Sequence, residues 1–197
     1  MEETLGFIIA ALALAGSPGP ANISLAATAA AFGGRRSLPY LFGIVSGMAV
    51  VVTVAAGGVT GALFAVSGLQ PAFAIAAAAY FLYLAYRIAT APPLEETAGE
   101  RRQPAFAAGL FLSLVNPKAY AAMTALFSGF ALTGVDPAAG LAIKLAVIAC
   151  VVVSVTALWL LAGAGLTRLF RDPKLNRLVN VIFAALLLAS LPFALLF

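Results

Sequence analysis

Lys118 is the residue whose position in this sequence most directly suggests chemistry. It follows Asn116 and Pro117 near the middle of an apolar block at residues 105–131. At 1.5 Å per helical residue it lies roughly 18 Å from either end of such a block, too far for its side chain to reach water easily. A charge at this depth costs about 3 kcal/mol or more and by default marks a functional site. The alternative is that the ammonium caps carbonyls freed by Pro18 or Pro117, and both roles are compatible.

A second polar motif interrupts another apolar block. The run Ser17-Pro18-Gly19-Pro20-Ala21-Asn22 lies inside residues 4–31. Each proline removes a backbone donor and clashes with the preceding turn, so both blocks are predicted to be helices broken near their midpoints. Irregular backbone at membrane depth persists only beside protein or a watery cavity, and paired breaks indicate a transport site.

The two breaks together predict one binding site for a carboxylate. No Asp or Glu lies inside an apolar block, so a substrate carboxylate is the expected counter-ion of Lys118. Helix N-termini at the breaks add free N–H groups, and Asn side chains can donate and accept. For Ser17, hydrogen bonding to the local backbone is equally expected. The predicted substrate-binding residues are Ser17, Pro18, Gly19, Pro20, Asn22, Asn116, Pro117 and Lys118.

Four further residues are possible accessory members of the site. Lys144 lies near one end of its block, where snorkelling to water accounts for it more simply. Tyr80 and Tyr83 share a helical stripe that is more often packing surface. Trp159 is deep in its block, where its N–H needs a partner and an inward position is expected.

Composition places the chain in a membrane. It has 197 residues, of which 63% are hydrophobic and 9% charged, whereas globular domains carry about 25% charged residues. We expect an all-α polytopic protein with six transmembrane helices, of which the first and fourth are broken. The predicted spans are residues 4–31, 38–66, 71–91, 105–131, 138–165 and 176–196.

The residue inventory argues against an enzyme. Histidine is absent, no carboxylates are paired within the blocks, and no phosphate-binding glycine loop occurs, so the usual hydrolytic and ATP-driven mechanisms lack their parts. A lone Cys150 forms no internal disulfide, and we expect no metal and no cofactor beyond H⁺ or Na⁺ as a coupling ion.

The distribution of charge predicts topology. The basic residues outside the blocks all follow the first, third and fifth blocks, whereas the opposite side holds Glu2, Glu3 and Asp136. The positive-inside rule then places both termini outside the cytoplasm of a bacterial inner membrane. The positive net charge therefore needs no nucleic-acid partner, although the basic face can also contact anionic lipid.

The two halves of the chain are predicted to be inverted copies. Three prolines recur at nearly constant separation, as the pairs Pro18 with Pro117, Pro39 with Pro137 and Pro71 with Pro173, and Gly34 pairs with Gly134. Residues 1–91 and 105–197 then form two three-helix repeats of opposite orientation, joined by a cytoplasmic linker at 92–104. The spacings Gly43–Gly47 and Gly57–Gly61 predict close helix packing, and such a face can also serve a homodimer.

These motifs resemble the LysE/RhtB family of bacterial amino-acid exporters. The resemblance rests on Ser17 to Asn22, Ala79-Tyr80-Phe81-Leu82, Asn116-Pro117-Lys118-Ala119 and Leu175-Asn176-Arg177, and covers essentially the whole chain. It implies six spans and ion-driven export of amino acids or related solutes. Some members carry an acidic residue midway along the fifth span, where this chain has Val153-Ser154-Val155-Thr156. A neutral zwitterion or an anionic solute is therefore expected rather than lysine.

The sequence leaves two functions open. The first is a secondary transporter that exports small carboxylate-bearing solutes by alternating access between the two repeats. The second is a passive channel or facilitator, since a polar inverted-repeat bundle can conduct. Saturable counterflow distinguishes the carrier from the channel.

Overall fold

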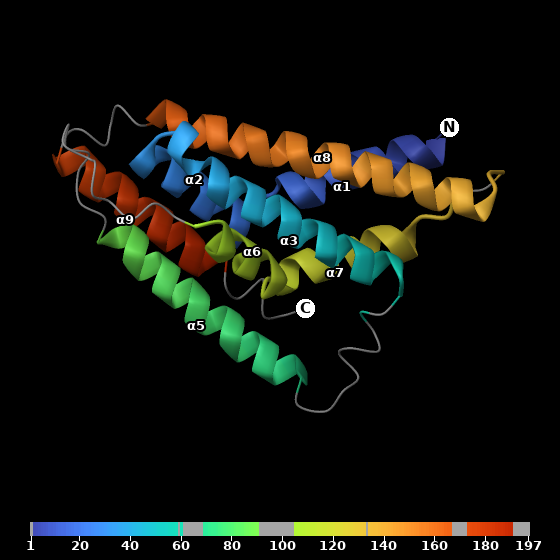
Figure 1. Ribbon diagram of the computed structural model, residues 1–197, viewed down its shortest axis with the longest axis horizontal. Coiled ribbons are helices and arrows are strands. Elements are labelled where there is room, and N and C mark those ends of the chain that lie inside the picture. Colours follow the sequence, from blue (N-terminus) through green and yellow to red (C-terminus); the bar gives the residue numbers. More distant parts are fainter. Residues whose placement is uncertain are drawn as a thin grey trace.

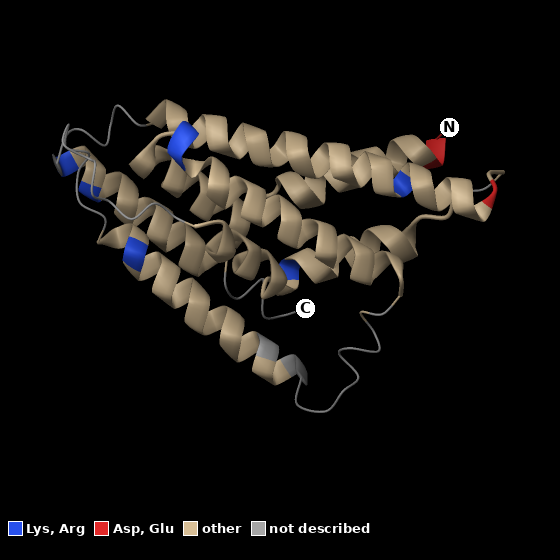
Figure 2. Ribbon diagram, viewed as in Figure 1, with Lys and Arg blue, Asp and Glu red and all other residues tan. Residues whose placement is uncertain are grey.

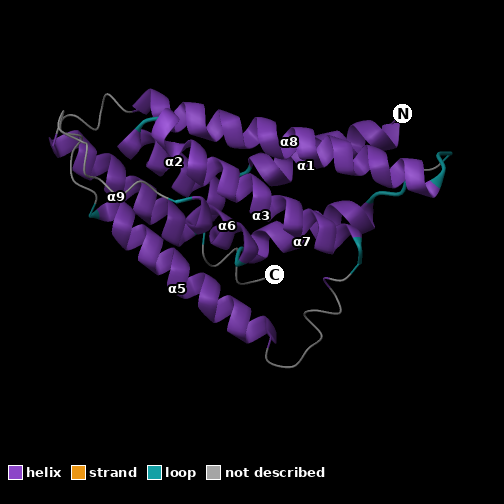
Figure 3. Cartoon of the chain, in the orientation of Figure 1, coloured by secondary structure: helices purple, strands orange, loops and turns teal. Residues whose placement is uncertain are grey.

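The described residues are entirely helical or loop, as the prediction of an all-α protein requires (Figure 3). The computed structural model describes residues 2–58, 60, 69–90, 105–132, 134–166 and 173–190. Its helices are α1 (Glu2–Gly16), α2 (Pro20–Phe32), the 3₁₀ helix η1 (Arg35–Ser37), α3 (Leu38–Ala56), α5 (Leu69–Ala89), α6 (Phe106–Leu114), α7 (Pro117–Gly129), α8 (Pro137–Gly165) and α9 (Pro173–Ala189).

Both predicted helix breaks are present. Helices α1 and α2 meet at 57°, and α6 and α7 meet at 59°. In each pair a proline starts the second helix, Pro20 in α2 and Pro117 in α7. Proline is well suited to this first position because its missing N–H would have no partner there in any case. The structure therefore confirms that the first and fourth apolar blocks are broken helices.

The predicted number of spans is matched only in part. Arg35–Ala56 and α8 are long and apolar enough to cross a membrane, and each broken pair adds a further candidate, which makes up to 4 within the described residues. Helix α9 has 17 residues, and the apolar part of α5 is Ala74–Ala89. In the second block, predicted at 38–66, α3 ends at Ala56 and is followed by Gly57 and Gly58, which disfavour a helix. The predicted end of this block, at residue 66, lies outside the described residues. The linker at 92–104 lies outside the described residues.

Small residues let particular helices approach closely. A Cβ added to Gly43 would lie 2.0 Å from the carbonyl oxygen of Phe106, and one added to Gly109 would lie 2.3 Å from that of Tyr40. Helices α3 and α6 are thus in backbone contact. Gly163 brings α8 onto α2 in the same way, with Ala26 O at 2.1 Å. The Gly43–Gly47 prediction is confirmed, whereas Gly57 follows the end of α3 and Gly61 lies outside the described residues.

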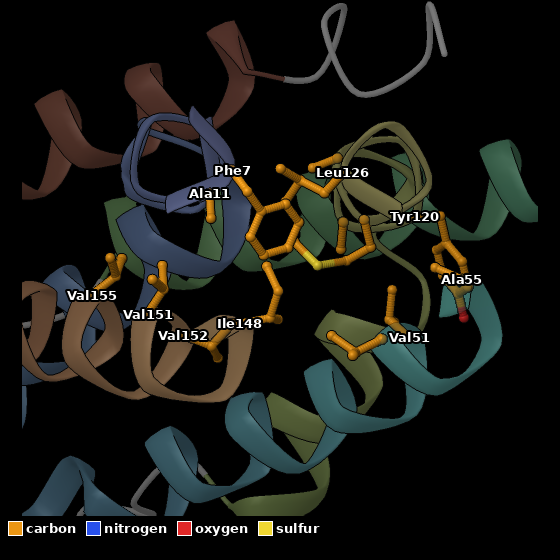
Figure 4. Close-up of a cluster of buried hydrophobic side chains, with 14 residues drawn as sticks. Phe7, Ala11, Val51, Ala55, Tyr120, Leu126, Ile148, Val151, Val152 and Val155 are labelled. Carbon is orange, nitrogen blue, oxygen red and sulfur yellow. The ribbon is translucent and has the colours of Figure 1, made fainter. Parts of the chain in front are cut away.

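The broken pairs contribute to the apolar clusters of the bundle. Helix α8 runs along one side of the molecule beside α1, and α5 and α9 lie together on the other side (Figure 1). One apolar cluster joins α1, α3, α7 and α8, with Phe7, Met123 and Ile148 among its most buried members (Figure 4). Asn116 in the second break is buried, whereas in the first break Gly19 is buried and Pro18 is exposed.

Candidate functional site

The ammonium of Lys118 joins the two helix breaks. Its Nζ donates to Ser17 Oγ at 2.7 Å, to the Ser17 carbonyl at 3.0 Å and to the Pro18 carbonyl at 3.1 Å. An ammonium has three N–H donors, so each one has an acceptor in the first break. All three acceptors are neutral. Lys118 therefore caps carbonyls freed at Pro18, the structural role considered above, while its positive charge stays without an anionic partner among these contacts.

Side chains from three helices satisfy the carbonyls exposed by the first break. Ser17 Oγ donates to Leu14 O at 2.9 Å, and Asn22 Nδ2 donates to Ala15 O at 2.8 Å and Ser17 O at 3.1 Å. The indole of Trp159, on α8, donates to Gly16 O at 3.3 Å. Together with Lys118 these donors serve five consecutive carbonyls, at residues 14–18. Unpaired buried carbonyls are costly, so the break is stable in this form.

Gly19 is required by the closeness of Lys118. A Cβ at this position would lie 2.8 Å from Lys118 Nζ and 3.0 Å from its Cδ. The backbone of Gly19 is extended, with φ −167° and ψ 174°, a conformation open to any residue. Its glycine identity therefore serves the approach of the lysine rather than a special backbone conformation.

The second break differs because one of its polar atoms has no partner. Asn116 occupies the position before the first residue of α7, yet its side chain makes no capping hydrogen bond, although Asn is among the best capping residues. The residue is 4% exposed, and its Oδ1 is buried without a hydrogen-bond partner. A buried acceptor of this kind calls for a specific explanation.

Two cavities border Lys118. The larger, of about 560 Å³, lies between the first break, α7 and the end of α9, and Ser17, Pro18 and Lys118 line it. The smaller, of about 60 Å³, lies among α1, α2, α3, α7 and α8. Leu14, Lys118 and Ala122 line both cavities. The larger has the size of a site for a small organic molecule, and the smaller has room for a few water-sized groups.

Most of the predicted binding residues meet at these cavities. Gly19, Asn22 and Asn116 line the smaller one, Ser17 and Pro18 line the larger one, and Lys118 lines both. Pro20 and Pro117 start helices α2 and α7. They orient two helix N-termini at the breaks, and no side-chain cap is present at either start. Such termini favour anions through their free N–H groups and the helix dipole.

The accessory residues lie elsewhere. Tyr80 donates its hydroxyl to Ala108 O at 3.0 Å, which attaches α5 to α6, and Tyr83 accepts from Arg87 at the surface. Lys144 donates to the carbonyls of Phe127 and Phe130 at the end of α7. Trp159 supports the first break. None of these four lines either cavity.

Sequence reasoning did not single out Thr156. It is 3% exposed and lines the smaller cavity. Its hydroxyl donates to the Val152 carbonyl within α8. The signal available in the sequence was a pair of hydroxyl residues, Ser154 and Thr156, midway along a long apolar block, which by itself does not reveal the face that each residue occupies.

A helical bundle that holds two broken helices and a half-buried cation beside a ligand-sized cavity is typical of a membrane transport protein. The chain belongs to the LysE type translocator family, which it matches over residues 12–197. It is accordingly a transporter and not an enzyme.

Curated relatives are cysteine/O-acetylserine efflux proteins. The proteins from Escherichia coli O139:H28 and Escherichia coli K12 are each 31% identical to this chain, over 177 and 176 residues, with 87% of this chain covered and 87% and 86% of theirs. The protein from Shigella flexneri serotype 5b is likewise 31% identical over 176 residues. No solved structure matches the chain.

Proposed function

We propose that this chain is a secondary transporter that exports a neutral amino acid, or a related small carboxylate-bearing solute, from the bacterial cytoplasm. The observation that carries the proposal is the contact of Lys118 with the first break. A half-buried ammonium from one broken helix is held by three neutral oxygens of the other, and it borders a cavity of about 560 Å³. A carboxylate is a stronger partner for an ammonium than a hydroxyl or a carbonyl.

In this mechanism the substrate carboxylate competes with Ser17 for Lys118. Once the carboxylate accepts from Nζ, the link between the two breaks is loosened, and the carbonyls of Ser17 and Pro18 lose a donor. Asn22 still serves Ser17 O. Binding is thereby coupled to a rearrangement of the helices that carry the site, as alternating access requires.

The substrate class follows from charge. Acidic side chains are absent from the residues that line the two cavities, so a second positive charge on the substrate would find no counter-ion there. Cysteine and O-acetylserine, the solutes named for the relatives, are amino acids with uncharged side chains. We expect the same class here, with lysine excluded.

Alternating access in this proposal uses two inverted repeats, residues 1–91 and 105–197. Their support is geometric. The broken pairs bend by 57° and 59°, and each is followed by a glycine with positive φ, Gly33 at 83° and Gly134 at 75°. Gly33 is thus a better structural counterpart of Gly134 than Gly34. In this scheme α3 corresponds to α8, and α5 and α9 are the third and sixth spans.

The proposed orientation places both termini outside the cytoplasm. Most basic residues of the described chain gather at one end of the molecule, and acidic residues lie at the opposite end beside the N-terminus (Figure 2). The basic residues within α7 and α8 lie apart from the basic end. This separation supports the positive-inside argument. An inner-membrane exporter with this orientation takes its substrate from the basic end, and either H⁺ or Na⁺ is the proposed coupling ion.

Counterflow in proteoliposomes tests the proposal. Vesicles loaded with unlabelled O-acetyl-L-serine should accumulate the labelled compound transiently and saturably, and L-lysine should compete poorly. The Lys118→Met variant, correctly inserted, should lose the activity. Flux that rises without saturation would instead identify a channel, and wild-type counterflow in Lys118→Met would exclude the proposed site.

A further inference from the structure

The smaller cavity holds polar atoms that the capping of the first break does not use. Asn116 and Thr156, from α7 and α8, face it at 4% and 3% exposure. Asn116 Oδ1 has no hydrogen-bond partner. These residues are remote in sequence, and both line the smaller cavity but not the larger one.

Three residues that line the smaller cavity offer acceptor oxygens. The hydroxyl proton of Thr156 is already donated to Val152 O, which leaves the lone pairs of Oγ1. Both N–H groups of the Asn22 amide are donated, to Ala15 O and Ser17 O, so its remaining polar atom is Oδ1. Asn116 adds Oδ1, which has no hydrogen-bond partner, and an amide group that keeps its two N–H donors. The acceptors on the three residues favour a cation or a strong N–H donor as their ligand.

Lys118 decides between these occupants. Its ammonium lines the same cavity, so a bare metal cation would face a like charge in a site without carboxylates. An amine joined to a carboxylate avoids this conflict, because the carboxylate neutralises Lys118 while the ammonium points away from it. The three donors of an α-ammonium also equal the three acceptor residues in number.

We propose that the smaller cavity is the amine-recognition part of the transport site, in which Asn116 Oδ1 and Thr156 Oγ1, with Asn22, accept hydrogen bonds from the substrate's α-ammonium. This inference rests on the proposed function. At about 60 Å³ the smaller cavity holds the amine but not a whole amino acid, and the larger cavity, across Lys118, holds the side chain. When the carboxylate draws Lys118 away from Ser17, the two cavities join around the substrate.

The test compares two ligands that differ in the amine alone. O-Acetyl-L-serine and 3-acetoxypropanoate share the ester and the carboxylate. Each is titrated as an inhibitor of labelled O-acetyl-L-serine counterflow in proteoliposomes, with wild type, Thr156→Val and Asn116→Leu. Thr156→Val keeps the side-chain shape and removes the acceptor. Thr124→Val is the matched control for the same substitution elsewhere. Thr124 Oγ1, on α7, is buried without a hydrogen-bond partner, and Thr124 lines neither cavity.

We expect wild type and Thr124→Val to prefer the amine-bearing ligand, and Thr156→Val to lose about tenfold or more of that preference, the effect of one hydrogen bond to a charged donor. Thr156→Ser should restore it. An unchanged ratio in both Thr156→Val and Asn116→Leu would overturn the inference and leave the cavity to water. Equal weakening of both ligands, with loss of Na⁺ dependence, would also overturn it in favour of a metal site. Absence of counterflow in wild type would instead refute the proposed function.

Discussion

The ammonium of Lys118 donates to both oxygens of Ser17, at 2.7 Å to the hydroxyl and 3.0 Å to the carbonyl, between residues 101 positions apart. The two broken helices are consequently one structural unit. A displacement of either break that stretches these bonds leaves a half-buried charge and two carbonyls without their hydrogen bonds together. Such a contact is either formed or broken, as a structural element that switches between two transport states requires.

Lys118→Met should abolish transport and lower thermal stability. Methionine fills a similar volume but leaves the Pro18 carbonyl without its donor and removes the only cation among the described residues that line the cavities. Because that hydrogen bond is exposed, we expect a loss of about 0.5 to 1.5 kcal/mol, the net contribution of a typical hydrogen bond. Thermal unfolding in detergent measures the stability, and counterflow measures the transport.

Lys144, the other lysine within an apolar block, provides the matched control for Lys118→Met. Lys144 also donates to backbone carbonyls, those of Phe127 and Phe130, but lines neither cavity. Lys144→Met should reduce stability by a comparable amount and keep the affinity for O-acetyl-L-serine within about threefold of wild type. A loss of substrate affinity equal to that of Lys118→Met would show that the sequence-based assignment of Lys144 to the site was correct.

Gly19→Ala should weaken substrate binding by displacing a side chain that it touches. The added methyl meets Lys118 Nζ at 2.8 Å, so the ammonium must move and give up part of its bonding to Ser17. We expect a fall in apparent affinity of about tenfold, with little change in folding because the backbone of Gly19 is extended. Concentration dependence of counterflow measures this, and an unaltered affinity would mean that the position of Nζ does not matter.

Two glycines near the end of α8 should respond oppositely to alanine. At Gly163 the methyl would lie 2.1 Å from the Ala26 carbonyl, so α8 and α2 must separate, at a cost of about 1 to 3 kcal/mol or more. At Gly165 nothing lies within 4 Å, and alanine should be neutral or stabilising by up to about 1 kcal/mol. Thermal unfolding of both variants decides this, and equal melting temperatures would contradict the close packing of these helices.

The donors at the first break should differ in importance. Trp159→Phe removes one donor, to Gly16 O, and should cost about 0.6 to 1.7 kcal/mol, the range for hydrogen bonds between membrane helices. Asn22→Leu removes two donors, to Ala15 O and Ser17 O, and should cost more. Proteolysis rates in detergent rank the variants, and the reverse order would indicate that the indole has a larger packing role than its hydrogen bond suggests.

The elements were largely predictable because their causes are local. Proline cannot donate within a helix, so Pro20 and Pro117 mark both breaks in the sequence itself. Two glycines also end α3 at Ala56, within the second predicted block, whose far end near residue 66 lies outside the described residues. Helix α9, with 17 residues, and the apolar part of α5, Ala74–Ala89, are shorter than the about 20 residues of a usual transmembrane helix. Hydropathy averaged over longer windows does not reveal these shorter lengths.

The site was predictable in its members but not in its connections. Sequence spacing indicated Lys118, Asn22 and Asn116 as candidates, since polar groups deep in apolar helices are costly and need a reason. It did not indicate that Lys118 serves the carbonyls of the other break, or that Thr156 faces the smaller cavity. Both depend on the rotation and packing of helices distant in the chain.

The sequence by itself determined that this protein is a membrane bundle with two broken helices and one deep cation, because hydrophobicity, proline geometry and the cost of a buried charge act within a few residues. The tertiary structure decided which hydrogen bonds are made. It gave Lys118 three neutral acceptors and left Asn116 Oδ1 with none. Hydrogen bonds form only between atoms brought within about 3 Å, and only the packing of α1, α7 and α8 fixes those distances.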